Sequence, residues 1–186
     1  MNPDEMVIGR ILRVNHAGEH GAISIYSAQL AHLGARHTDL RTWLEETLAH
    51  ERAHREAFRG SMQDRHVTPC GALAVWSVGG WVLGCLTALL GRRGVMACTA
   101  AVERAVHGHL EEQIAFLLHT DPTLAALVQE IQKEEMEHLS YAEDRIPPGS
   151  ITARLVEPLI AVCTNALIAL STQGVSLTLN GELRRS

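Results

Sequence analysis

Hydrophobic positions recur every three or four residues along most of the chain, which is the spacing of a buried helix face. Residues 5–33 follow this pattern, and Gly34 comes directly after them as a typical helix terminator. A second helix begins near Thr38 and Asp39, two preferred N-cap residues, and extends to about Arg65. No segment alternates between apolar and polar residues for long enough to predict a strand, so we expect an all-α fold.

The middle of the chain is its most apolar part, because residues 70–91 contain no charged side chain. Three further helical patterns follow it: residues 94–119, 122–144 and 150–171. Asp121-Pro122 marks the start of the second of these, since aspartate caps a helix and proline suits its first turn. We expect one domain over residues 1–172 and a polar, poorly ordered tail over 173–186.

Two Glu-x-x-His motifs share one arrangement with a glutamate that precedes each of them. In both halves of the chain a lone glutamate lies 32 positions before the glutamate of the motif. Glu19 precedes Glu51 in the first half, and Glu103 precedes Glu135 in the second. The spacing within each motif puts its glutamate and histidine on one helix face. The six residues are Glu19, Glu51, His54, Glu103, Glu135 and His138.

Both intervals have their midpoint at a predicted turn, at Ala35 beside Gly34 and at His119 beside Asp121-Pro122. Antiparallel hairpins folded at these points bring each lone glutamate level with its motif, which is the ligand set of a di-metal site in a four-helix bundle. Four carboxylates and two imidazoles suit iron or manganese. The bland alternative is that these residues face solvent, as most helical glutamates and histidines do. The agreement of both midpoints with turns favours the metal site.

Composition narrows the class of protein further. Aromatic residues make up only 4% of the chain, as expected for alanine- and leucine-rich helices packed on helices. The formal charge of −5 argues against nucleic acid as a partner. The four cysteines form no C-x-x-C pair and are expected to be buried, reduced thiols. No basic segment followed by an apolar run opens the chain, so we expect a cytoplasm-facing protein, with a processed organellar form as the alternative.

The octapeptide N-H-A-G-E-H-G-A at residues 15–22 strongly resembles a signature of the demethoxyubiquinone hydroxylases, the di-iron enzymes of late ubiquinone synthesis. The resemblance covers residues 8–170. Its further segments are residues 50–54, the tryptophan stretch 76–84, and residues 87–91, 96–99, 101–103 and 134–138. The combination of these segments is highly specific for that family.

The resemblance implies a ferritin-like four-helix bundle with an apolar crossover helix and an additional C-terminal helix. It also implies that Glu19 and Glu103 are terminal iron ligands and that Glu51 and Glu135 bridge the two irons. The two motif histidines, His54 and His138, would bind one iron each.

Other histidines compete for roles near such a site. His109 matches a position where the family has histidine followed by tyrosine, but Leu110 stands here in place of the tyrosine. We therefore carry over His109 alone, as a weak candidate for a catalytic role. For His50 and His107 the alternatives are a contact with the ligand side chains and a surface position, and helical phase favours the surface. His16 belongs to the signature, with a local capping or packing role as its alternative.

The apolar segment 70–91 is long enough to be considered as a membrane span. A single crossing would separate the ends of the two ligand-bearing helices that it connects, so we expect instead a crossover helix. Trp76 and Trp81 would lie at a membrane interface, where residues 150–171 could add to the same surface. A plain core helix is the alternative.

The resemblance implies a di-iron monooxygenase that hydroxylates 2-polyprenyl-3-methyl-6-methoxy-1,4-benzoquinol (demethoxyubiquinol), with O2 as co-substrate. NADH or another reductant would supply electrons, through bound quinone or a partner protein, since the sequence has no G-x-G-x-x-G fingerprint. The alternatives are a ferritin-like iron-binding or ferroxidase protein and a metal-free bundle at a membrane surface.

The expected partners are a polyprenyl quinone, a membrane surface that meets the 70–91 segment, and other proteins of ubiquinone synthesis, with self-association left open. Nucleic acid is excluded on charge. We expect a peripheral position on the cytoplasmic face of a bacterial inner membrane. The matrix side of the mitochondrial inner membrane is the alternative.

Overall fold

The computed structural model describes residues 3–33 and 38–171, and for residues 167–171 the backbone alone. The predicted turn at Ala35 and the predicted tail 173–186 lie outside the described residues. The described part is all-helical, as predicted. Its elements are α1 (Pro3–His32), α2 (Thr38–Asp64), α3 (Leu73–Leu89), α4 (Gly91–Thr120), α5 (Pro122–Glu143) and α6 (Ile151–Ser171).

The helix boundaries follow from the capping residues in the sequence. Asp121 accepts a hydrogen bond from the backbone N–H of Leu124 at 3.0 Å, and Pro122 occupies the first turn of α5, as predicted. Gly91 has a φ of 63°, a conformation that glycine adopts without strain, and it separates α3 from α4. Helix α4 therefore begins three residues earlier than the pattern over 94–119 indicates.

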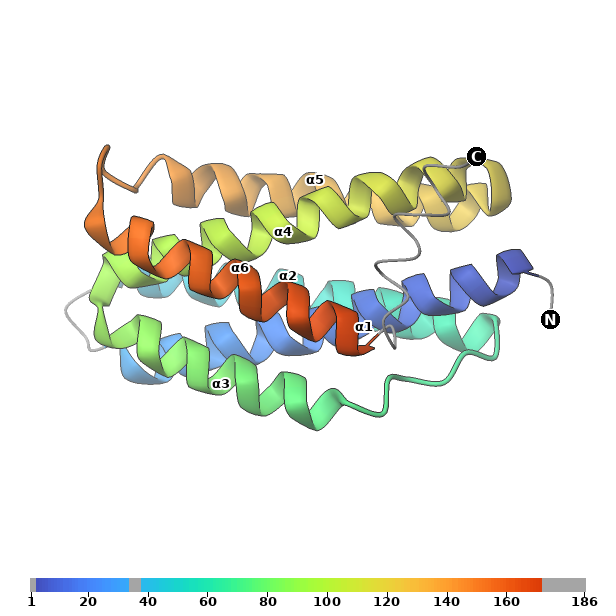
Figure 1. The fold of residues 1–186 in the computed structure, drawn as a ribbon, viewed down its shortest axis with the longest axis horizontal. Helices are drawn as coiled ribbons and strands as arrows, with labels where there is room; N and C mark the ends of the chain where they lie inside the picture. The colour runs from blue at the N-terminus through green and yellow to red at the C-terminus, as the bar shows by residue number, and fades with distance from the viewer. Residues whose placement is uncertain (1–2, 34–37, 172–186) are drawn as a thin grey trace.

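Helices α1, α2, α4 and α5 form the bundle, and α3 returns the chain along its length (Figure 1). Because α3 runs back, α2 and α4 point in the same direction, which confirms the predicted crossover. Helix α6 packs along α4 on the near side of the bundle in Figure 1. Arg104 fixes it there, since its guanidinium binds Glu143 of α5 at 2.7 Å and Glu157 of α6 at 3.0 Å.

Two glycines let α3 lie unusually close to α1. A Cβ on Gly80 would lie 2.5 Å from the carbonyl oxygen of Gly21, and a Cβ on Gly84 would overlap the carbonyl oxygen of Ile25. The indole of Trp76 fills the space beside Gly21 and is only 6% exposed. The prediction of an interfacial Trp76 is therefore wrong, because this close packing of α1 and α3 makes it a core residue.

The described core has two large apolar clusters at different levels of the bundle and a small one that contains Val14, Ala17 and Trp76. One large cluster is built around Tyr26 and Leu44, and the other around Phe58 and Leu117. In each bundle helix the candidate ligands lie between residues of the two large clusters. A polar layer thus lies inside an otherwise apolar interior.

The cysteines differ in their surroundings. All four are free thiols, but only Cys98 is buried, whereas Cys70 and Cys85 are partly exposed and Cys163 is exposed. The expectation of buried thiols is thus correct for one and wrong for the others, because the apolar face of α6 that carries Cys163 does not turn fully inward. Burial raises the pKa of the Cys98 thiol to about 12.

None of the helices in the described ranges is long and apolar enough to cross a bilayer.

Candidate metal centre

The structure brings the six predicted side chains together in the polar layer. They form two overlapping groups, within each of which the nearest ligand atoms lie within 4.8 Å of one another. Glu51 and Glu135 belong to both groups. The first group adds Glu19 and His54, and the second adds Glu103 and His138.

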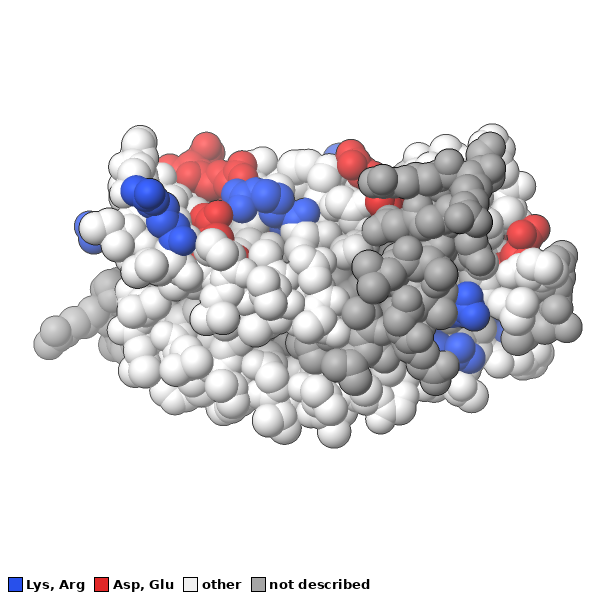
Figure 2. Space-filling view, in the orientation of Figure 1, with Lys and Arg blue, Asp and Glu red and all other residues white. Residues whose placement is uncertain are grey.

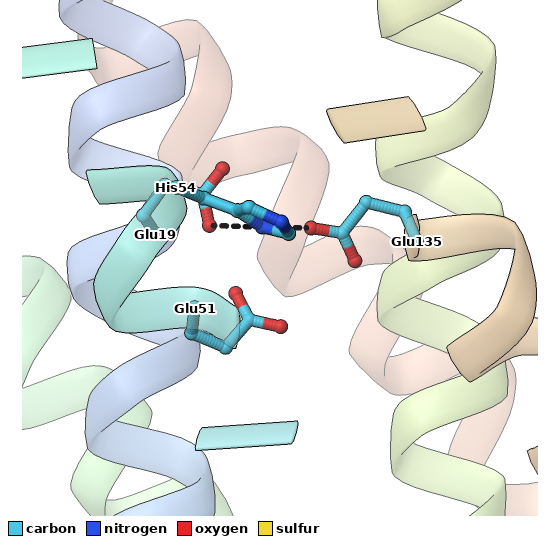
Figure 3. Close-up of side chains that lie close together, drawn as sticks. All are labelled: Glu19, Glu51, His54 and Glu135. Atoms are coloured by element: carbon cyan, nitrogen blue, oxygen red, sulfur yellow. Dashed lines mark hydrogen bonds and ion pairs between the residues drawn. The ribbon is translucent and has the colours of Figure 1, made fainter. Parts of the chain in front are cut away.

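Each histidine of the cluster points one ring nitrogen inward. His54 Nδ1 lies 3.0 Å from Glu135 and 3.9 Å from Glu19, as Figure 3 shows. His138 Nδ1 lies 3.3 Å from the other oxygen of Glu135 and 3.6 Å from Glu51. The two imidazoles therefore approach the shared carboxylates in the same way, as the repeated motif implies.

The outward ring nitrogens have partners of different chemistry. His54 Nε2 lies 3.0 Å from the Glu134 carboxylate, which accepts its hydrogen bond. His138 Nε2 lies 3.1 Å from His50 Nδ1, and these two rings are stacked with their centroids 5.4 Å apart. Contacts of this kind fix the orientation of a ligand histidine. His50 is exposed, as predicted, and still reaches the cluster.

Burial dominates the electrostatics of the carboxylates. The six residues are at most 7% exposed. Burial and the charge of Glu135 raise the pKa of Glu19 to about 7 and raise the pKa values of Glu51 and Glu103 well above their usual range. Burial also acts on Glu135, but hydrogen bonds with both histidines outweigh it and lower its pKa. Burial lowers the pKa of His54, yet the bond to Glu135 outweighs this and raises it to about 9.

These observations show that the residues fit a pair of divalent cations. Four buried carboxylates are costly to hold without compensating positive charge. Glu51 Oε1 is buried and has no hydrogen-bond partner among the described residues. The donor set of carboxylates and imidazoles is one that iron and manganese accept.

Tyr26 and Glu134 are contacts of the cluster that the sequence analysis missed. The Tyr26 hydroxyl donates a 2.6 Å hydrogen bond to Glu103 Oε1. Tyr26 follows Glu19 by seven residues, which is two helical turns and therefore the same face. Glu134 directly precedes a motif glutamate. The sequence contains both spacings. Neither spacing shows which helix lies opposite the residue in the bundle, so neither contact could be predicted.

The remaining candidates lie around the cluster. His109 lines a cavity beside it, and Leu110 is buried in the apolar core next to the same cavity. His107 is partly exposed and pairs with Glu111 at 3.3 Å, away from the six side chains. His16 is buried, and its Nδ1 has no hydrogen-bond partner among the described residues, so a packing role suits it better than a capping role.

A cavity of about 570 Å³ opens onto the cluster. Its wall includes Glu19, Glu51, Glu103 and Glu135, together with the polar residues Asn15, His109, Glu112, Gln113 and Thr164. The rest of the wall is apolar and comes from α1, α3, α4 and α6. Residues from α3 and α6 that line it include Val82, Leu83, Leu86, Leu159 and Ile160. The arrangement suits an apolar molecule with one end held at the carboxylates.

Comparisons with known proteins agree with this site. The family described as "Ubiquinone biosynthesis protein COQ7" matches residues 6–171. A relative from Rhodospirillum rubrum, named 3-demethoxyubiquinol 3-hydroxylase, is 42% identical over 138 residues, which are 73% of this chain and 65% of that protein. A relative from Mus musculus, named NADPH-dependent 3-demethoxyubiquinone 3-hydroxylase, mitochondrial, is 34% identical over 174 residues, or 89% of this chain and 78% of that protein. The chain therefore belongs to the COQ7 family of ubiquinone biosynthesis proteins.

Proposed function

We propose that this protein is a di-iron monooxygenase that hydroxylates demethoxyubiquinol in ubiquinone biosynthesis. The observation that carries the proposal is the contact between the apolar cavity and the four buried glutamates. A substituted quinol ring with a polyprenyl tail is an apolar molecule whose polar atoms lie at one end. The hydroxylase names of the relatives support the same reaction.

In this proposal the six side chains hold two iron ions. Glu51 and Glu135, which belong to both groups, would be shared by the two ions, and each ion would also be held by one of Glu19 and Glu103 and by one histidine. When bound, the iron pair supplies the redox chemistry by which one oxygen atom of O2 enters the ring. The chain's own contribution is to orient the ring in the cavity and to exclude water from it.

The polar contacts beyond the ligands keep the cluster in place. Tyr26 donates to Glu103, and Glu134 accepts from the outward nitrogen of His54. Each contact satisfies a group that would otherwise be buried without a partner. The same contacts limit rotation of the ligand side chains, so the cluster is preorganised for two cations.

In this proposal the electrons for the reaction come from a separate reductant. The mouse relative is named as NADPH-dependent. Because the sequence has no Gly-rich dinucleotide fingerprint, we propose that NADPH or NADH acts through a bound quinone or a partner protein.

An apolar surface beside the cavity supports a peripheral position on a membrane. The exposed side chains that form it are Val75, Val78, Trp81, Val82, Leu86 and Leu89 of α3 with Ile151, Leu155, Leu159 and Val162 of α6. In Figure 2 the lower left part of the view, where α3 lies in Figure 1, carries no charged group. A polyprenyl quinol dissolved in a bilayer would reach the cavity between α3 and α6 without crossing water.

The membrane contact is tested with liposomes that contain a polyprenyl quinone. Val78→Asp, which replaces a 65% exposed valine on α3, should abolish flotation with the vesicles. Leu118→Asp is the matched control, because Leu118 is 50% exposed on α4, outside the apolar surface. Equal flotation of the two variants would contradict the proposed membrane contact.

The reaction is tested with purified protein loaded anaerobically with Fe(II). Demethoxyubiquinol with a short prenyl chain, a chemical reductant and 18O2 are then supplied, and quinones are analysed by mass spectrometry. The proposal predicts a hydroxylated quinol that contains one atom of 18O, and no such product with Glu135→Ala. Iron oxidation without quinol hydroxylation would contradict the proposal and favour the ferroxidase alternative.

A further inference from the structure

A line of three aromatic rings connects the candidate metal centre with the protein surface. Tyr26, whose hydroxyl is bonded to Glu103, has its ring centroid 6.4 Å from that of Trp43 in an edge-to-face contact. Trp43 in turn stacks on Tyr141 with centroids 4.5 Å apart and ring planes within 3° of parallel. Tyr26 is 1% exposed and Trp43 is 9% exposed, while Tyr141 is partly exposed.

The outer end of this line carries a positive charge. The guanidinium carbon of Arg145 lies 3.4 Å from the centre of the Tyr141 ring. Arg145 also donates to the backbone carbonyl of Tyr141 at 3.0 Å, which holds it over the ring. A small anion that approaches Tyr141 would therefore meet a favourable charge.

The chemistry of the three rings exceeds what packing requires. The chain has only three tryptophans, two tyrosines and two phenylalanines, and both tyrosines lie in this line. Tyrosine and tryptophan are readily oxidised by one electron, whereas phenylalanine is not. The two phenylalanines, Phe58 and Phe116, belong to the other apolar cluster. All three rings of this line are thus oxidisable.

The line also leaves the cluster on the side away from substrate. Apart from Glu51 and Glu135, the residues that line the cavity come from α1, α3, α4 and α6, whereas Trp43 lies on α2 and Tyr141 on α5. Within the described ranges none of the three rings lines the cavity. Electrons that pass along the line therefore bypass a quinol bound there.

We propose that Tyr26, Trp43 and Tyr141 form an electron relay that discharges an oxidising equivalent from the metal centre when no quinol occupies the cavity. The proposal rests on the proposed O2-dependent hydroxylase function, since O2 supplies the oxidising equivalent. It adds a protective activity to that function, because an oxidising equivalent without substrate would otherwise attack the ligands.

Each transfer in the relay is balanced. Tyr26 gives one electron to the oxidised centre and its phenolic proton to Glu103 Oε1, which lies 2.6 Å away. Trp43 then reduces Tyr26, which takes its proton back from Glu103, and Trp43 is left as a radical cation. Tyr141 reduces this cation and releases its phenolic proton to solvent, which reaches its partly exposed ring. A one-electron donor in solution, of the thiolate or ascorbate class, reduces Tyr141, which regains a proton from solvent, and the donor is itself oxidised to a radical. The net change is one electron from the external donor to the centre.

Phenylalanine substitutions separate this role from packing. Trp43→Phe and Tyr141→Phe keep an aromatic ring in the core and remove its oxidisable group. Trp81→Phe is the matched control, because Trp81 is 45% exposed on α3, outside the relay. Circular dichroism and thermal unfolding establish that each variant is folded before it is used.

The radical itself is the readout. Fe(II)-loaded protein is mixed with O2 in the absence of quinol and freeze-quenched for electron paramagnetic resonance, and its oxidised residues are mapped by peptide mass spectrometry. We expect a tyrosyl radical in the wild type and in Trp81→Phe, loss of its Tyr141 component in Tyr141→Phe, and increased oxidation of peptides with ligand residues in Trp43→Phe.

The outcomes distinguish the relay from the proposed function. Identical radical signals and oxidation maps in the wild type, Trp43→Phe and Trp81→Phe would overturn the relay. Quinol hydroxylation by the wild type without any tyrosyl radical would also overturn it, while leaving the hydroxylase proposal intact. Failure of the wild type to hydroxylate quinol would count against the proposed function itself.

Discussion

The buried carboxylates make the stability of the metal-free protein fall as the pH rises. The pKa of Glu19 is raised to about 7, from the usual value near 4.5, so the folded state holds a proton that the unfolded state releases. A group whose pKa is higher in the folded protein than in the unfolded chain stabilises the fold fully at pH values below its unfolded-state pKa. This stabilisation is lost as the pH rises through the folded-state pKa. Between pH 5.5 and 8.5 this loss is about 2 kcal/mol for Glu19.

His54 acts in the same direction. Its pKa of about 9 means that its contribution is complete below its ordinary value of 6.5 and is lost as the pH rises through 9. This adds about 2 kcal/mol over the same range. Because His54 interacts with Glu19, the two contributions are not additive, and we expect these two groups to account for a loss of about 2–4 kcal/mol. The raised pKa values of Glu51 and Glu103 act in the same direction. Glu135, whose pKa is lowered, contributes a constant amount above pH 5.5.

Urea unfolding of the metal-free protein at pH 5.5 and pH 8.5 measures this difference directly. Glu19→Gln is the control, since glutamine keeps the side-chain shape without a titrating group, and its pH dependence should be smaller. Bound metal should reverse the trend, because cations compete with protons for the same ligands. Stability of the metal-free protein that is constant or higher at pH 8.5 would refute the account of the cluster.

Three further predictions concern the scaffold. Gly84→Ala should lower the free energy of unfolding, measured in urea, by about 1–3 kcal/mol, because the added methyl group overlaps α1. Gly108→Ala should raise it by about 0.5–1 kcal/mol, because the methyl group meets open space beside α4 and alanine favours the helix. Asp121→Ala should cost about 1–2 kcal/mol through loss of the α5 N-cap, and an unchanged unfolding midpoint would contradict the role of the cap. Iodoacetamide should modify Cys163 in native protein while Cys98 stays unmodified, which peptide mass spectrometry can check; rapid labelling of Cys98 would show that α4 is not packed as described.

Local sequence signals were sufficient for the helices and for one of the two hairpins. Asp121 and Pro122 stop one helix and start the next, and the structure has α4 and α5 on either side of them. The matching turn at Ala35 lies outside the described residues and stays a prediction. The equal spacing of the glutamates was sufficient to predict the cluster. In two antiparallel helices joined by a tight turn, residues at equal distances from the turn lie side by side.

Features that depend on contacts between distant helices were not predicted. Tryptophan in an uncharged segment is typical of a membrane interface. Trp76 lies in the core because Gly21, which faces it on α1, has no Cβ and leaves space for the ring. The aromatic line combines residues from three helices, so no local pattern reveals it. His50 illustrates both cases: its helical phase correctly places it on the surface, but its contact with His138 comes from α5.

The number of Fe(II) ions bound per chain tests the central claim most directly. Metal-free protein is titrated anaerobically with Fe(II), and bound iron is measured after removal of the excess. Six side chains with two shared carboxylates predict two ions per chain for the wild type, and fewer for Glu51→Ala, which removes a carboxylate common to both groups. A wild-type value of one or none, or two ions in Glu51→Ala, would contradict the paired site.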